Sequence, residues 1–298
     1  MRARAWLAFV GLGITWGLPY FFIKIAVREI SPFDVAWGRI TLAALILLPI
    51  AWRRGALRAL APHKAAVLAF ALVEFTIPFC LISMGERWIP SSVTAILIAT
   101  VPLIIAFISR FFGLHERLGT VRLTGLLVGL AGVVALVGLG TLSGPLAWAG
   151  VGCVMLSTVC YAIGALTIQR YLHAVDSIGP IAGSLAVSSL VLLVPAMLSL
   201  PHRMPSALAL SSVAILGLVC TALSMLMMFY LVKNAGASRA AIITYINPAV
   251  ATLLGMALLD ERLGAWGLTG FGLILLGSWL ATRGSAATAE VAAAEASP

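Results

Sequence analysis

Apolar residues form ten long stretches of the chain, and short segments with charged or turn-forming residues separate them. Each stretch has close to the ~20 residues that an α-helix needs to cross the hydrocarbon core of a bilayer. The joining segments are too short for a separate domain, so the pattern predicts an all-α integral membrane protein of ten transmembrane helices. The predicted spans are residues 5–27, 33–52, 65–84, 91–112, 121–140, 147–168, 178–199, 209–231, 240–259 and 264–282.

Composition excludes a water-soluble fold, because 62% of the residues are hydrophobic and 10% are charged, against roughly 25% charged residues in a soluble domain. The net charge of +9 first indicates membrane orientation, since Lys and Arg accumulate on the cytoplasmic side. With the N-terminus placed inside, thirteen of the 19 Lys and Arg residues are cytoplasmic. The distribution predicts a multi-pass protein of the inner (plasma) membrane with both termini cytoplasmic, and it indicates no nucleic-acid partner. Five basic residues fall on the opposite side and one inside the second span: Lys24, Arg28, Arg87, Arg203, Arg262, and Arg39.

Two segments of the chain are near-copies of each other, ERLGTVRLTG at residues 116–125 and ERLGAWGLTG at residues 261–270. Seven of the ten positions are identical at an offset of 145 residues, which indicates an internal duplication. Five spans per unit is an odd number, so the second unit would enter the membrane in the opposite orientation. We predict two inverted five-helix repeats around a central cavity, residues 1–142 and 143–283, and a disordered tail over 284–298. The two ERL segments could pair across the repeats and act as gates, but we favour charge anchors for the turns before spans five and ten, outside any binding site.

Further segments extend the pattern: WGLPYFFIK in the first span, Arg39 in the second, SSVTAILIATVPL before the first ERL, and ASRAAIITYINPAV before the second. Together they resemble the ten-helix EamA-type permeases of the drug/metabolite transporter superfamily, over residues 5–282. The resemblance implies a transporter, not an enzyme, that exports amino acids, other metabolites or drugs. The chain has no ATP-binding loop of the G-x-x-x-x-G-K-[ST] type, so ion or solute gradients would have to drive transport.

The favoured function is export of small metabolites, above all neutral or aromatic amino acids, by alternating access. A proton-coupled exporter of drugs or cationic metabolites is the main alternative. A membrane-embedded lipid-modifying enzyme is more remote, because it would need polar chemistry clustered at one interface. The four Cys and four His residues are dispersed, so neither a cofactor nor a metal is predicted. The expected partners are the lipid bilayer and a small solute, and the expected state is a monomer.

The first span offers one polar face, because Trp16, Tyr20 and Lys24 follow each other at intervals of four residues. The same face of the sixth span carries Tyr161. Trp16 lies in mid-span, unlike a tryptophan of the interfacial aromatic belt. These aromatic side chains are therefore candidates to bind substrate, with ordinary helix packing as the alternative, whereas Lys24 is expected to extend outward to the interface.

Glu74 is the one carboxylate predicted near mid-membrane, where a charge is costly and by default functional. It could bind a substrate ammonium or carry a proton, or it could form a structural hydrogen bond. Pro78 and Phe79 follow it in the same span and are included in the candidate site. Arg39 could receive a substrate carboxylate or form a structural pair with a residue such as Asp34 or Glu86.

The ninth span places three polar residues, Thr244, Tyr245 and Asn247, directly before Pro248. Proline interrupts the hydrogen bonding of a membrane helix, and such breaks are tolerated where they face protein or water. We therefore predict that these three residues bind substrate. Pro248 and its repeat mate Pro102 are predicted to act in conformational change, as is Arg39.

Overall fold

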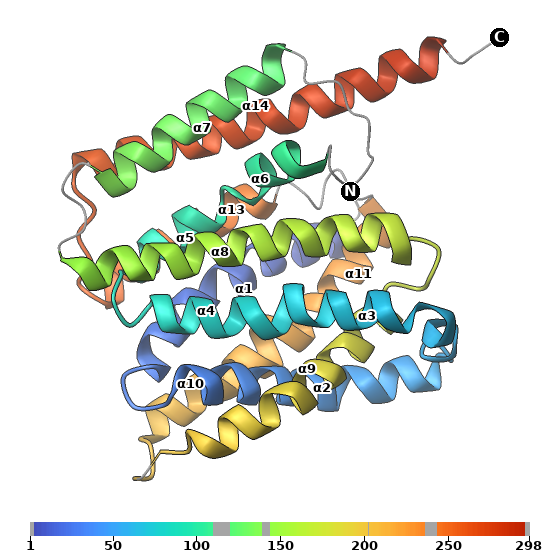
Figure 1. Ribbon diagram of the computed structural model, residues 1–298, viewed down its shortest axis with the longest axis vertical. Coiled ribbons are helices and arrows are strands. Elements are labelled where there is room, and N and C mark those ends of the chain that lie inside the picture. The colour runs from blue at the N-terminus through green and yellow to red at the C-terminus, as the bar shows by residue number, and fades with distance from the viewer. Residues whose placement is uncertain (1–2, 110–119, 139–143, 202, 236–242, 296–298) are drawn as a thin grey trace.

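The computed structural model describes residues 3–109, 120–138, 144–201, 203–235 and 243–295, and all regular elements in these ranges are helices (Figure 1). Several predicted spans consist of two or three shorter helical segments that follow each other directly. The elements are α1 (Ala3–Ala26), α2 (Pro32–Arg53), η1 (Arg58–His63), α3 (Lys64–Phe70), η2 (Ala71–Thr76), α4 (Ile77–Gly85), α5 (Ser91–Ile98), α6 (Val101–Ile108), α7 (Thr120–Gly138), α8 (Pro145–Thr167), η4 (Ile168–Leu172), α9 (Ile178–Leu198), α10 (Ala207–Gly217), η5 (Leu218–Leu223), α11 (Ser224–Ala235), α13 (Ile243–Leu258) and α14 (Ala265–Glu295).

Seven helical stretches in the described residues are long and apolar enough to cross a membrane, and three shorter apolar helices accompany them. The all-α integral membrane class is therefore confirmed, while the count of ten spans stays a prediction. The seven stretches are Trp6–Ala26, Pro32–Arg53, Arg58–Gly85, Ser91–Ile108, Pro145–Leu172, Ile178–Leu198 and Ala207–Leu231; the shorter ones are Leu123–Leu136, Ile246–Leu258 and Ala265–Leu280.

Helices from the first half of the sequence pack against helices from the second half throughout the bundle. Helix α1 contacts α13, α2 contacts α9 and η5, and α4 contacts α8. Helices α7 and α14 lie side by side along one edge, at the top of Figure 1. Glycines allow this pair to approach closely: Gly132 lies against the backbone of Gly270, and Gly277 lies against the backbone of Gly125 and Gly129.

Two mid-span segments, η2 and η5, are π-helical and occupy corresponding positions in the sequence. Their backbone hydrogen bonding is completed by two threonines that are 145 residues apart, the offset of the repeat. Thr76 Oγ1 donates to the Ala71 carbonyl at 3.1 Å, and Thr221 Oγ1 donates to the Leu216 carbonyl at 2.8 Å. Single π-helical turns are often found at functional sites, and both of these border the cavity described below.

The prolines and the C-terminal tail refine the predicted elements. Pro102 lies in the first turn of α6, where a missing N–H costs little, and Pro78 lies where the π-helical segment η2 passes into α4. Pro248 lies inside α13, which continues through it. Helix α14 extends through Glu295, where a disordered tail was expected from residue 284, because its alanine-rich sequence has high helix propensity.

Candidate functional site

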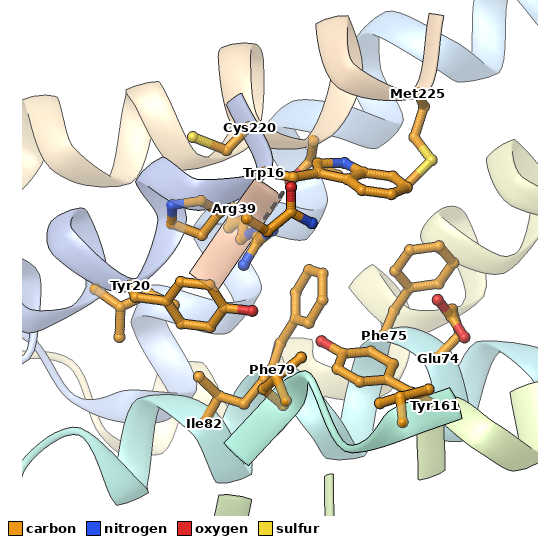
Figure 2. Close-up of a pocket in the computed structure, with 16 residues that line it drawn as sticks. Trp16, Tyr20, Arg39, Glu74, Phe75, Phe79, Ile82, Tyr161, Cys220 and Met225 are labelled. Atoms are coloured by element: carbon orange, nitrogen blue, oxygen red, sulfur yellow. Dashed lines mark hydrogen bonds between the residues drawn. The ribbon is translucent and has the colours of Figure 1, made fainter. Parts of the chain in front are cut away.

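A cavity of about 210 Å³ lies in the middle of the bundle, where segments from both ends of the chain meet (Figure 2). Six predicted binding residues line it, and so does Arg39. Pro78, Pro102 and Pro248 do not, and the side chains of Thr244 and Tyr245 lie outside the described residues. The lining consists of Trp16, Pro19, Tyr20, Ile23, Arg39, Glu74, Phe75, Phe79, Ile82, Ile98, Val101, Tyr161, Cys220, Thr221, Met225 and Asn247.

Arg39 on α2 is buried and is held in one orientation from two sides. Its Nε donates to Thr221 Oγ1 at 2.8 Å, and its guanidinium carbon lies 3.9 Å from the centre of the Phe79 ring. Neither predicted structural partner, Asp34 or Glu86, is hydrogen-bonded to Arg39. The Asp34 carboxylate instead accepts hydrogen bonds from Ser31 and Ser199. In the described part of the chain, the terminal Nη atoms of Arg39 have no hydrogen-bond acceptor. A fixed guanidinium with two free nitrogens is suited to bind a carboxylate in bidentate fashion.

Glu74 lies in η2 and contributes a carboxylate to the same cavity. No described residue forms a hydrogen bond or ion pair with it, so the structural hydrogen bond considered from the sequence is not observed. Gly164 on α8 makes room for this side chain, because a Cβ at that position would overlap Oε2 of Glu74. A carboxylate without a partner in a mostly apolar cavity can bind a cation or a proton.

Aromatic side chains surround the two charged groups. Figure 2 shows the hydroxyl groups of Tyr20 and Tyr161 pointing towards the middle of the cavity from opposite sides, beside the Phe79 ring. Among the described residues, neither hydroxyl has a hydrogen-bond partner. Trp16 and Phe75 add further apolar wall. The cavity thus offers opposite charges, hydroxyl groups and flat apolar surfaces to one small solute.

Asn247 joins α13 to α1 at the edge of the cavity. With its amide oriented to satisfy its surroundings, the nitrogen donates to the carbonyl oxygens of Ile243 at 3.0 Å and Gly13 at 3.3 Å. This nitrogen is therefore used in helix packing, and the predicted binding role of Asn247 stays a prediction. Pro78, in the first turn of α4, contacts α8, because its carbonyl accepts a hydrogen bond from Ser157 at 3.4 Å.

The sequence did not identify three second-half residues that line the cavity, namely Cys220, Thr221 and Met225. A signal was present, because Thr221 corresponds to Thr76 at the offset of 145 residues. Apolar lining residues such as Ile82 and Ile98 carry no such signal, since lipid-facing positions have the same composition. Within the described residues, no group of three or more His, Cys, Asp or Glu side chains could hold a metal ion.

The second ERL segment has a different role from the one expected. Instead of anchoring only its own turn, Glu261 reaches α5 and accepts four hydrogen bonds of 2.6–2.9 Å from the backbone and side chains of Ser91 and Ser92. Lys24 also differs from expectation. Its Nζ does not extend outward but donates to the carbonyl oxygens of Glu86 and Ile89, at 2.5 and 2.8 Å.

Two known proteins that are similar to this chain match nearly all of it. The sequence is 30% identical to the uncharacterized inner membrane transporter YedA of Escherichia coli strain K12, over 95% of this chain and 94% of that protein. It is 27% identical to an uncharacterized transporter of Archaeoglobus fulgidus, over 94% and 99% of the two chains. A solved crystal structure with 20% sequence identity covers 96% of this chain with a TM-score of 0.67, which supports the fold.

The model of the EamA-like transporter family matches the chain twice, at residues 3–138 and again at residues 148–283. These two matches cover most of the sequence and include the helices that line the cavity. Together with the apolar helices, they identify a multi-pass membrane protein that is a transporter rather than an enzyme. The chain belongs to the EamA-like transporter family.

Proposed function

We propose that the protein is a secondary transporter that exports small zwitterionic metabolites, above all neutral or aromatic amino acids. One observation carries this proposal: the free Nη atoms of Arg39 and the free carboxylate of Glu74 line the same cavity. Arg39 would bind the substrate carboxylate, and Glu74 would bind the ammonium group. Tyr20, Tyr161 and Trp16 would pack against an apolar or aromatic side chain.

The volume of the cavity helps to choose between the two transport alternatives. At about 210 Å³ it is smaller than the roughly 300–1,000 Å³ of sites for drug-sized ligands. Glu74 alone would also attract a cationic drug. The additional free guanidinium would repel such a cation, and this favours a zwitterion.

Alternating access would arise from two inverted halves, residues 1–142 and 143–283, that move around the cavity. The repeated match to the family model and the corresponding π-helical segments support this proposal. Contacts such as those of α1 with α13 and α2 with η5 would form the boundary between the moving parts.

The test is flux measured in proteoliposomes that contain the purified full-length chain. A panel of radiolabelled amino acids, purines and cationic dyes would be tested with and without a pH gradient. We expect saturable flux of at least one neutral or aromatic amino acid. Movement of dyes driven by protons, with no flux of any amino acid, would overturn the proposal in favour of a drug exporter.

Glu74→Gln is expected to lower amino-acid flux while membrane insertion stays normal. The amide keeps the size of the side chain but removes the negative charge, and a hydrogen bond to a charged group contributes about 1.5–3 kcal/mol. We therefore expect a loss of roughly tenfold to a hundredfold in flux at low substrate concentration. Near-normal flux of this variant would show that Glu74 does not bind substrate.

A second pair of variants separates the position of Glu74 from its charge. Gly164→Ala places a methyl group against Oε2 of Glu74 and should lower flux although the carboxylate remains. Gly152→Ala is the matched control on the same helix, because no other atom lies within 4 Å of a Cβ at that position. Equal flux in both glycine variants would contradict the inferred contact between α8 and Glu74.

A further inference from the structure

At one end of the bundle, on the left in Figure 1, a cap of hydrogen bonds joins the two halves of the sequence. We define the cap as Glu261 together with Ser91 and Ser92, the first two residues of α5. The carboxylate of Glu261 takes the place that an anion occupies at a helix N-terminus. Gly255 on α13 completes the contact, because a Cβ there would overlap the Glu261 carboxylate. The cap therefore connects α5, α13 and the segment before α14.

Glu86 lies beside this cap, in the turn between α4 and α5, and it is completely buried. Neither of its carboxylate oxygens has a hydrogen-bond partner in the described part of the chain. A buried carboxylate usually receives several hydrogen bonds or an ion pair, since an isolated charge is costly to bury. Within the described residues, Glu86 thus has no hydrogen bond that compensates a negative charge.

The charged groups near Glu86 are engaged elsewhere. Lys24 on α1 donates to the backbone carbonyl oxygens of Glu86 and Ile89. Arg39 on α2 donates to Thr221, and the Glu261 carboxylate accepts its four hydrogen bonds from Ser91 and Ser92. Tyr20 on α1 is the remaining titratable neighbour. Burial raises the pKa of Glu86 well above its usual range, and the negative charge of Glu261 adds to this shift, against the opposing effect of Lys24 and Arg39. The closed cap therefore favours a proton on Glu86.

We propose that Glu86 is a proton-binding site that controls the cap. With the proton bound, the carboxyl group is neutral and does not repel Glu261, so the cap stays closed. When Glu86 releases its proton to water, the resulting carboxylate repels Glu261 and requires hydration, and both effects favour an open end. The proton alone is exchanged, between the carboxyl oxygen and water, and the proposal does not depend on which solute the central cavity binds.

The direction of the pH effect follows from the raised pKa. The pKa of Glu86 is higher in the closed state than in the open, hydrated state. Acidification therefore favours closure, and alkalinisation favours opening. Each unit of difference in pKa between the two states changes the ratio of open to closed molecules by up to about tenfold. A purely structural Glu86, protonated at all accessible pH values, would give no such change.

Protonation can be measured without any substrate, on the full-length chain in lipid nanodiscs. Infrared difference spectra recorded across pH should show a protonated carboxylic acid that is lost as the pH rises, and Glu86→Gln should lack this signal. Glu86→Asp should keep the signal with a shifted midpoint. The proposal would be overturned if the wild-type spectrum showed no titrating carboxylic acid, or if the signal persisted unchanged in Glu86→Gln.

Opening of the cap can be measured at Ala95, a buried residue of α5 that packs with Tyr20 and Ala251. Ala95→Cys would be labelled with a maleimide in the wild-type and Glu86→Gln backgrounds, with mass spectrometry to separate this site from the native cysteines. At each pH the labelling rate in the wild-type background is divided by the rate in the Glu86→Gln background, so that the intrinsic pH dependence of the thiol cancels. We expect a ratio near one in acid that rises several-fold with pH. A ratio that stays constant would show that Glu86 does not control the cap.

Discussion

Arg39→Lys should abolish most of the discrimination between an amino acid and its primary amide. Lysine keeps the positive charge but loses the planar pair of nitrogens that can bind both oxygens of a carboxylate. It also loses the donor to Thr221 and the stacking on Phe79 that fix the guanidinium. Hydrogen bonds to charged groups contribute about 1.5–3 kcal/mol, which corresponds to a loss of roughly tenfold to a hundredfold in flux of the carboxylate substrate.

The measurement compares initial rates for the best amino-acid substrate and its amide in proteoliposomes. The amide lacks the carboxylate, so its slow flux should change little in Arg39→Lys. Arg28→Lys, at an exposed position after α1, is the matched control and should transport both compounds normally. If Arg39→Lys lowered the flux of both compounds equally, Arg39 would be structural and would not bind the carboxylate.

Glu261→Ala should destabilise the protein more than any other single change at the capped end. The backbone N–H groups of Ser91 and Ser92 are completely buried and would lose their acceptor. Each buried group without a partner costs about 1–3 kcal/mol, so the two together cost on the order of 2–6 kcal/mol. We expect a clear decrease in the midpoint of thermal unfolding, followed by tryptophan fluorescence in detergent.

Two further variants define the origin of this effect. Glu29→Ala removes a carboxylate that accepts hydrogen bonds in the same way at the start of α10, from the backbone and hydroxyl of Ser206 at 2.6 and 2.7 Å. These hydrogen bonds lower the pKa of Glu29, but the side chain is exposed to solvent, so water can replace it and the change should be much smaller. Glu261→Gln should be intermediate, because one acceptor oxygen becomes a donor. Equal thermal midpoints for Glu261→Ala and Glu29→Ala would disprove the importance of the buried cap.

Much of the helical architecture could be predicted from hydrophobicity alone. The second and seventh predicted spans, 33–52 and 178–199, agree with α2 and α9 to within one residue at each end. The π-helical turns were not predicted, since apolar residues surround them and their stability depends on tertiary contacts. Ser188 on α9, for example, donates to the Ala71 carbonyl in η2 at 3.0 Å.

The candidate site could be predicted where one helix face carries the signal. The spacing of Trp16 and Tyr20 identified a cavity wall, and the cost of a charge in the membrane identified Glu74. The environments of Lys24 and Glu261 could not be predicted, because their hydrogen-bond partners are 62 to 170 residues away in the sequence. Hydrophobicity describes the depth of a residue in the bilayer, but it does not specify which helix lies opposite.

The glycine contacts between α7 and α14 have a consequence for the origin of the chain. Gly125 corresponds to Gly270, and Gly132 to Gly277, at the offset of 145 residues. Gly277 packs against Gly125, and their counterparts Gly132 and Gly270 pack against each other, so the two contacts are equivalent under the repeat. Reciprocal contacts of this kind are typical of a two-fold symmetric homodimer. It is the contact expected if two separate copies of a half-length ancestor associated before their genes were joined.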